Sequence, residues 1–184
     1  MNNGYLEIIL GPMFSGKTTR LVEIYNKHSR SSKNVVAINY SKDTRYHDTM
    51  LSTHDKVLIP CIFADNIQSL LSREDLLNAN VILINEGQFF EDIYDSVLTL
   101  VEKMHKKVFV CGLDGDFKRN KFGNLLDLIP YSDCIVKLHS NCTKCNNYAI
   151  FSHRISCEQN QVVIGSDNYM PLCRYCYQLQ NAIA

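Results

Sequence analysis

YLEIILGPMFSGKT, at residues 5–18, decides the fold of this chain. An apolar run over residues 5–10 leads directly into GPMFSGKT at 11–18, which fits the pattern G-x-x-x-x-G-K-[ST]. In this pattern the glycines let backbone N–H groups wrap around phosphate groups, and the N-terminus of the following helix favours negative charge. The placement between an expected strand and an expected helix therefore indicates a phosphate-binding loop rather than a chance glycine turn.

This loop supplies the first candidate site residues. Lys17 is expected to reach the β- and γ-phosphates of a nucleotide, and the Thr18 hydroxyl is expected to bind Mg²⁺. GTPases of the Ras type add an N-K-x-D motif, but the Asn-Lys pairs here continue as NKHS at 26–29 and NKFG at 120–123, which disfavours a GTPase. The expected phosphate contacts are Gly11, Pro12, Met13, Phe14, Ser15, Gly16, Lys17 and Thr18.

Further apolar runs and two helical patterns in the sequence indicate an α/β fold. The runs are rich in Val and Ile and mostly lack alternation, which is typical of strands buried on both faces of a parallel sheet. They are VVAINY at 35–40, VILI at 81–84, VFVCG at 108–112 and DCIVKL at 133–138. Apolar side chains share one helix face after Lys17, and again between residues 93 and 104. We therefore predict a mainly parallel sheet flanked by helices.

Composition narrows the class of protein. The chain has 184 residues, 46% of them hydrophobic, and its 19 basic and 19 acidic residues cancel, so charge gives no argument for binding nucleic acid or a membrane. The N-terminal sequence MNNGYLEIIL has no cationic segment of a signal peptide, and no apolar run is long enough to span a bilayer. We expect a cytosolic protein, in which cysteines indicate metal ligands or buried thiols rather than disulfides.

The α/β pattern stops near Ser140, where we place a boundary between a nucleotide-binding domain, 1–139, and a small region, 140–184. The second region shows no helix-length periodicity and is expected to be held together by something other than a core. Two C-x-x-C pairs lie in it, formed by Cys142, Cys145, Cys173 and Cys176. Two such pairs fit a closed, structural Cys₄ zinc site better than a redox dithiol.

The segment between the two pairs, residues 146–172, is called the lasso below. Because both its ends are tied to the expected zinc site, it is a candidate cover for a substrate. The other cysteines show no partner spacing and are assigned no function. They are Cys61, Cys111, Cys134 and Cys157.

The strand at 81–84 ends in Asn85 and Glu86, within VILINEGQFF. A nucleotide enzyme commonly offers an aspartate to the metal at such a strand end, whereas Asn85 carries no charge. We expect Thr18 and the nucleotide phosphates to hold the metal directly, with Asn85 acting through a water molecule. Glu86, at the carboxyl end of a central strand, is where an α/β sheet presents a group that can accept a proton.

Taken in order, six motifs resemble the type II thymidine kinase family, both cellular and poxviral. They are GPMFSGKT, KDTRY at 42–46, THDK at 53–56, NEGQFF at 85–90, LDGDFKRNKFG at 113–123 and the paired C-x-x-C motifs, and together they cover about residues 5–177. The resemblance implies a RecA-like P-loop core, a zinc-anchored lasso over the nucleoside and ATP-dependent phosphorylation of the thymidine 5′-hydroxyl. It also implies a homotetramer that the end product dTTP inhibits.

The resemblance also implies roles for individual residues. Glu86 matches the catalytic base, and Arg45 matches a position where a cation neutralises charge on the transferred phosphoryl group, although a solvated surface arginine is the alternative. Two segments match those that face the phosphates in the family. One consists of Asp43, Thr44 and Arg45, and the other consists of Asn85, Glu86, Gly87 and Gln88. The wall around the base is Met13, Phe89, Leu113 and Phe117; for the two phenylalanines, plain core packing stays open. The lasso contacts to thymine are Gln161, Val162, Val163, Ile164, Gly165 and Tyr169.

Three alternatives stay open at this level. One is a nucleoside or nucleotide kinase that selects another base. The second is a zinc-bearing P-loop ATPase that acts on nucleic acid, which predicts a basic stripe that the neutral composition does not support. The third is an attenuated member of the family that only binds nucleotide, and Asn85 is the feature that favours it.

Overall fold

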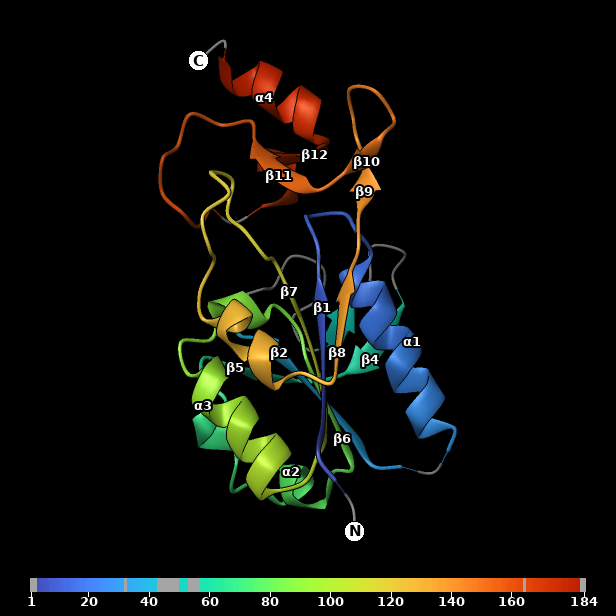
Figure 1. Ribbon diagram of the computed structural model, residues 1–184. Helices are drawn as coiled ribbons and strands as arrows, with labels where there is room; N and C mark the ends of the chain where they lie inside the picture. The colour runs from blue at the N-terminus through green and yellow to red at the C-terminus, as the bar shows by residue number, and fades with distance from the viewer. Residues whose placement is uncertain (1–2, 32, 43–49, 53–56, 164, 183–184) are drawn as a thin grey trace.

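A six-stranded parallel sheet forms the centre of the protein (Figure 1). The computed structural model describes residues 3–31, 33–42, 50–52, 57–163 and 165–182. The strands follow the order β5-β2-β6-β7-β1-β8. Their bounds are β1 Tyr5–Leu10, β2 Val35–Tyr40, β5 Ile62–Ala64, β6 Val81–Ile84, β7 Lys107–Gly112 and β8 Cys134–Lys137. The parallel α/β prediction is confirmed, and each of the five predicted strands is present.

Alternate side chains of each central strand enter two separate apolar layers. Ile8 and Ile82 belong to one buried cluster, whereas their neighbours Ile9 and Leu83 belong to the other. Successive side chains of a strand point to opposite faces, so a strand covered on both faces must be apolar throughout. This explains why these runs show no alternation in the sequence.

Helices cover both faces of the sheet (Figure 1). α1, Lys17–Ser29, packs its buried Leu21 and Ile24 into the layer that contains Ile9. α2, Glu74–Asn78, and α3, Ile93–Leu98, contribute to the opposite layer. The second predicted helix is present, but α3 changes into a π-helical turn over Thr99–Lys103 before β7 begins. Short 3₁₀ turns lie at Gln68–Leu70, Gly87–Phe89, Leu125–Tyr131 and Ser166–Asn168.

Two features of the first domain were not predicted. β5 adds the outer strand next to β2, and a small antiparallel pair forms between β3, Met50–Ser52, and β4, Leu58–Pro60. Each of these strands has only three residues. Segments this short give no measurable hydrophobic period, and only their pairing with neighbours defines them as strands.

The region after Ser140 has more regular structure than the sequence indicated. β9, Ser140–Asn141, pairs with β10, Tyr148–Ala149, and β11, Phe151–Arg154, pairs with β12, Tyr169–Leu172. α4, Arg174–Ala182, follows, although we noted no helix-length periodicity in this region. The helix has only nine residues, two of them buried, Cys176 and Tyr177.

The expectation that this region lacks a core also needs correction. Ala149, Leu172 and Tyr177 form a buried cluster there together with three of the four paired cysteines, Cys142, Cys173 and Cys176. The cluster is small, and its side chains come from β10, β12 and α4 or from residues beside these elements. Three of the four candidate metal ligands are therefore also packing residues of this cluster.

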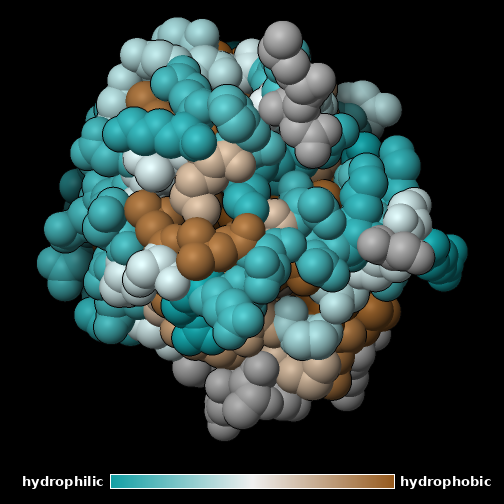
Figure 2. Space-filling view, turned by 90° about the horizontal axis from the view of Figure 1, so that it is seen from below, coloured by the Kyte–Doolittle hydropathy of each residue, from teal (hydrophilic) through white to brown (hydrophobic). Residues whose placement is uncertain are grey.

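The end of the molecule opposite this region is mostly hydrophilic, with hydrophobic residues gathered near its middle and again toward the lower right of the view (Figure 2). Within the described residues, no helix combines the length and the apolar character that crossing a membrane requires.

Candidate active site

The phosphate loop occupies the connection between β1 and α1. Gly16, just before the helix, has φ 81°, in the left-handed region that glycine adopts without strain. The Lys17 ammonium is buried and donates a 2.7 Å hydrogen bond to the Pro12 carbonyl, across the loop. Phe14, at φ 63°, is a non-glycine residue in the left-handed region and is 45% exposed. The loop is therefore folded with its lysine turned inward.

A cavity of about 700 Å³ opens above this loop. Its volume is within the range of sites that hold small ligands and cofactors. The lining comprises residues 13–19, Tyr40, Lys42, Ser52, Glu86, Phe89, Leu113, Gly115, Asp116, Phe117, Phe122, Ser152, Gln161, Val162, Val163, Gly165 and Tyr169. The structure thus brings the phosphate loop, the end of β6 and the lasso to one cavity, as the sequence predicted.

Some predicted residues lie behind the cavity wall. Asn85, Gly87 and Gln88 are buried but do not line the cavity. A Cβ at Gly87 would lie 2.7 Å from Val110 Cγ1, so a larger residue in this turn would force the Val110 side chain of β7 to shift. Asn85, Gly87 and Gln88 therefore lie behind the residues that face the cavity. Gly11 and Pro12 also lie outside the cavity lining.

Asn85 is the centre of a buried hydrogen-bond network. Its Oδ1 accepts from Thr18 Oγ1 at 3.4 Å and from Cys111 Sγ at 3.0 Å. Its Nδ2 donates to Asn39 Oδ1 at 2.8 Å. Thr18 and Asn85, which the sequence analysis assigns to the same metal, are therefore in direct contact. Asn39 and Cys111 were not predicted as members of this site.

Glu86 presents its carboxylate to the cavity from a constrained backbone. Its φ is 55° and its ψ is 42°, a left-handed conformation that costs a non-glycine residue about 1–3 kcal/mol and persists where the surroundings enforce it. Gln88 Nε2 donates to Glu86 Oε2 at 2.5 Å, while Gln88 Oε1 accepts from the Leu113 backbone N–H at 2.9 Å. Gln88 therefore orients the carboxylate and ties it to the segment after β7.

Aromatic side chains form the wall beside Glu86. Phe89 stacks on Tyr40 with ring centroids 5.2 Å apart and meets Phe122 edge-on at 5.4 Å. The Phe89 ring therefore both lines the cavity and packs against its neighbours, and its contact with a base stays a prediction. Phe117 lines the cavity too. Tyr40 and Phe122 were missed, since each is an ordinary apolar residue in the sequence.

Hydrogen bonds between described residues join the C-terminal region to the first domain. Ser152 Oγ, on β11, accepts from the Met13 N–H of the phosphate loop at 2.9 Å. Gln161 Nε2, in the lasso, donates to Asp116 Oδ2 at 3.0 Å. The Tyr177 hydroxyl of α4 donates to the Phe117 carbonyl at 2.6 Å. The lasso is therefore held against the cavity at both edges, by contacts that the sequence did not reveal.

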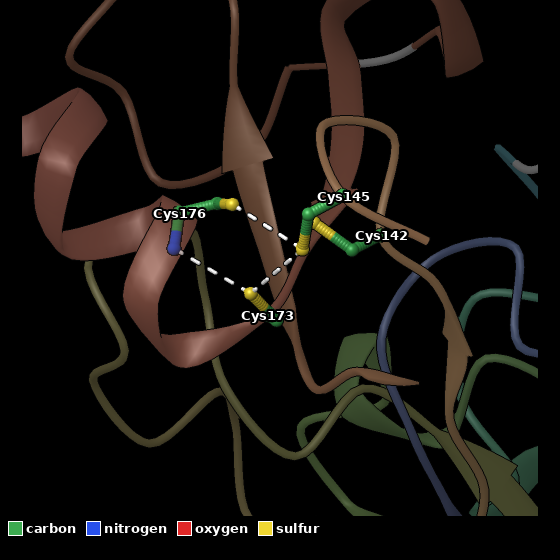
Figure 3. Close-up of side chains that lie close together, drawn as sticks. All are labelled: Cys142, Cys145, Cys173 and Cys176. Carbon is green, nitrogen blue, oxygen red and sulfur yellow. Dashed lines mark hydrogen bonds between the residues drawn. The ribbon is translucent and has the colours of Figure 1, made fainter. Parts of the chain in front are cut away.

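The four paired cysteines converge at one point (Figure 3). Their sulfur atoms all lie within 4.8 Å of one another, and the sulfur of Cys145 is 3.6 Å from that of Cys173 and 3.5 Å from that of Cys176. A disulfide would need about 2.05 Å. Thiolates around a tetrahedral zinc ion, each about 2.3 Å from the metal, lie about 3.8 Å apart.

Hydrogen-bond donors also approach these sulfur atoms. The Cys176 backbone N–H donates to Cys173 Sγ at 3.5 Å, and Asn147 Nδ2 donates to Cys145 Sγ at 3.5 Å. Such donors stabilise thiolates, which are the form that binds zinc. The donor set therefore fits a closed zinc site with no position left for a substrate.

Comparison with known proteins now connects the cavity with a family. A family model described as thymidine kinase matches residues 4–177. The chain belongs to the thymidine kinase family. It is 42% identical over 178 residues to the thymidine kinase of Variola virus, covering 96% of this chain and 98% of that protein. The prediction of the family is confirmed.

Other comparisons agree on family and fold. The thymidine kinase of rice, Oryza sativa subsp. japonica, is 40% identical over 179 residues, which is 95% of this chain and 66% of the rice protein. Among solved structures, the flagellar accessory protein FlaH of Methanocaldococcus jannaschii superimposes with a TM-score of 0.54 at 12% identity, covering 80% of this chain and 76% of that one. At this identity the likeness concerns the fold alone.

Part of the thymidine kinase site predicted from sequence lies outside the described residues. This holds for Asp43, Thr44, Arg45 and Ile164. Their roles stay predictions.

Replacement of one paired cysteine tests the metal site. We expect Cys173→Ser to lose bound zinc and to lower the melting temperature, because three thiolates leave the tetrahedral site incomplete and Cys173 also belongs to the small buried cluster. Metal content by atomic emission and thermal unfolding measure this. Cys157→Ser is the matched control, since Cys157 is exposed and lies in the lasso outside the sulfur cluster. Full zinc content in Cys173→Ser would contradict the assignment.

Proposed function

We propose that this chain transfers the γ-phosphate of ATP to the 5′-hydroxyl of thymidine, which yields dTMP for DNA synthesis, and that it phosphorylates deoxyuridine more weakly. One observation supports the proposal most directly: residues of the phosphate loop, Glu86 and residues of the lasso all line one cavity. A phosphate donor at the loop and a hydroxyl acceptor under the lasso would meet at Glu86. Membership of the thymidine kinase family supports the same chemistry.

The ATP phosphates would lie against residues Gly11–Thr18, where backbone N–H groups of the loop and the N-terminus of α1 favour negative charge. Lys17 is turned into the loop by its hydrogen bond to Pro12, and it would exchange that partner for phosphate oxygens. Thr18 would bind Mg²⁺, which supplies positive charge to the phosphates when it is bound. Asn85 accepts a hydrogen bond from Thr18 Oγ1 and would so orient that hydroxyl toward the metal.

Glu86 would accept the proton of the attacking hydroxyl. Its carboxylate faces the cavity, and Gln88 holds one of its oxygens in place. A carboxylate fixed in this way can take the proton as the hydroxyl oxygen bonds to the γ-phosphorus. Arg45, with Asp43 and Thr44, would approach the phosphates from the other side and neutralise charge on the transferred group, as the family resemblance implies.

The nucleoside would lie between the aromatic wall and the lasso. Met13, Phe89, Leu113 and Phe117 would contact the flat faces and edge of the base. The lasso backbone would hold the polar edge of thymine, through Gln161, Val162, Val163, Ile164 and Gly165, beside the Tyr169 ring. Such a pocket fits the thymine methyl group, and a missing methyl costs only about 1–3 kcal/mol, so deoxyuridine would still bind.

The remaining features follow the family resemblance. We propose that residues 1–139 form the ATP-binding kinase domain and that residues 140–184 form the zinc-bound lasso region. The working form would be a homotetramer inhibited by dTTP. The reduced thiols that a Cys₄ zinc site needs suit the cytosol.

A nucleoside assay tests the function directly. With ATP and Mg²⁺, thymidine should be converted to dTMP, and deoxyuridine should react with kcat/KM lower by about 10–200-fold, because it lacks one methyl contact. Thin-layer separation of the nucleotides, with deoxycytidine as the comparison, measures this. Equal rates for deoxycytidine would argue for a different base pocket. ATP hydrolysis that depends on DNA, without any dTMP, would instead support an ATPase acting on nucleic acid.

Replacement of the proposed base gives the second test. Glu86→Gln keeps the shape of the side chain but removes its ability to take a proton, so kcat should fall by about 10²–10⁴-fold. ATP affinity, measured by calorimetry, should stay near that of the unmodified protein. The matched control is Glu91→Gln, since Glu91 is exposed on the same segment and does not line the cavity. Unchanged turnover in Glu86→Gln would remove this residue from the mechanism.

Restoring a carboxylate at position 85 gives the third test. In Asn85→Asp the acceptor beside Thr18 gains a full charge, and the Asn39 amide can rotate to donate to it, so the Mg²⁺ concentration for half-maximal rate should fall by about 10-fold or more. Magnesium titration of the initial rate measures this. Asn66→Asp adds the same charge at an exposed position and should leave the requirement unchanged. An unchanged requirement in Asn85→Asp would show that residue 85 is not coupled to the metal.

A further inference from the structure

Arg154, the last residue of β11, is a buried cation for which the described residues supply no salt-bridge partner. Only 5% of it is exposed, whereas arginine is seldom buried without a paired charge. Its guanidinium lies under the part of the lasso that connects β11 to β12. A charge in this position needs some other compensation, and the surrounding backbone provides it.

Carbonyl oxygens of the lasso supply that compensation. Nη1 donates to the Glu158 carbonyl at 3.1 Å and also to the Asn160 carbonyl. Nη2 donates to the Gln161 carbonyl at 2.9 Å and also to the Tyr169 hydroxyl. Residues at four positions along the lasso are thereby drawn toward one side chain.

Two aromatic rings enclose the same guanidinium. Its Cζ lies 3.8 Å from the centroid of Phe117 and 5.0 Å from that of Tyr169. Both rings line the cavity, and the Tyr169 hydroxyl in turn donates to the Val163 carbonyl at 3.2 Å. Arg154 therefore joins a wall residue from the first domain to the lasso segment that covers the cavity.

We propose that Arg154 is a positioning residue, which sets the shape of the lasso over the nucleoside and so the affinity for thymidine. The proposal rests on the proposed function. The C=O and N–H of a trans peptide point in opposite directions, so a Gln161 carbonyl turned toward Arg154 turns the Val162 N–H away from it. By fixing which carbonyls face inward, Arg154 fixes which backbone groups of residues 161–163 remain for a ligand.

Arginine is suited to this role in a way that lysine is not. Its planar guanidinium has several donors in a fixed arrangement and stacks flat on an aromatic ring, whereas the lysine ammonium is a compact point charge. In Arg154→Lys the charge remains, but one ammonium cannot stack on Phe117 and also serve carbonyls bound by two separate nitrogens. The substitution therefore separates the effect of shape from the effect of charge.

Kinetics of Arg154→Lys test the proposal. KM for thymidine should rise roughly 10-fold or more, the size of effect expected when charge-assisted hydrogen bonds are lost, while kcat, KM for ATP and zinc content change little. Arg119→Lys is the matched control. Arg119 also lies over two rings, Tyr177 and Phe151, yet within the described part of the chain it makes no hydrogen bond to residues 155–168. Arg154→Ala should regain thymidine affinity when guanidinium ions are added at millimolar concentration.

A readout that needs no activity separates this proposal from the proposed function. Glu158 is exposed and lies on the lasso, so a glutamate-specific protease should cut there faster in Arg154→Lys than in the unmodified protein or in Arg119→Lys. If the unmodified protein makes no dTMP but the cleavage rates differ as stated, the proposed function fails and the structural role of Arg154 stands. Unchanged KM together with unchanged cleavage would overturn the proposal, and so would loss of zinc in Arg154→Lys, since that indicates a general folding role.

Discussion

The parallel pairing of β6, β7 and β1 is the constraint on which the site depends. In this arrangement the carboxyl ends of neighbouring strands emerge at the same edge of the sheet. The phosphate loop follows β1, Asn85 and Glu86 follow β6, and Leu113 follows β7, so these residues meet without any long-range side-chain recognition. Apolar side chains on both faces of these strands pack into two buried layers and hold the sheet in the interior of the domain. The cavity is a consequence of this packing.

Asn85 shows how a position can depart from the common metal motif and remain part of a buried polar site. Its amide has both a donor and an acceptor, and the structure uses both, toward Asn39 on one side and toward Thr18 and Cys111 on the other. A carboxylate in the same place would offer acceptors only. The amide pair therefore satisfies buried polar groups at the ends of two adjacent strands, and the uncharged residue leaves more of the charge balance to the metal and the phosphates.

The C-terminal region combines a metal-ligand cluster with a covering segment. The four cysteine sulfur atoms at the two ends of residues 146–172 converge, and a zinc ion bound there would close this segment into a loop and reduce its freedom. The Ser152–Met13 and Gln161–Asp116 hydrogen bonds then attach it to the first domain, and Arg154 organises its carbonyls. The small region and one wall of the cavity are in this way parts of the same structure.

Residues whose roles depend on local spacing could be predicted from the sequence alone. The glycines and Lys17 of the phosphate loop, the five long apolar strands, Glu86 at a strand end and the four paired cysteines all follow patterns that a short stretch of chain displays. Short elements such as β5, with three residues, and α4, with nine, were not predicted, because so few residues show little of a repeating pattern. Asn39, Asp116, Ser152 and Arg154 could be assigned only from the tertiary structure. Ser152 lies 139 positions from the Met13 N–H that it binds, and a contact between polar residues so far apart depends on how the whole chain packs, which spacing along the sequence does not encode.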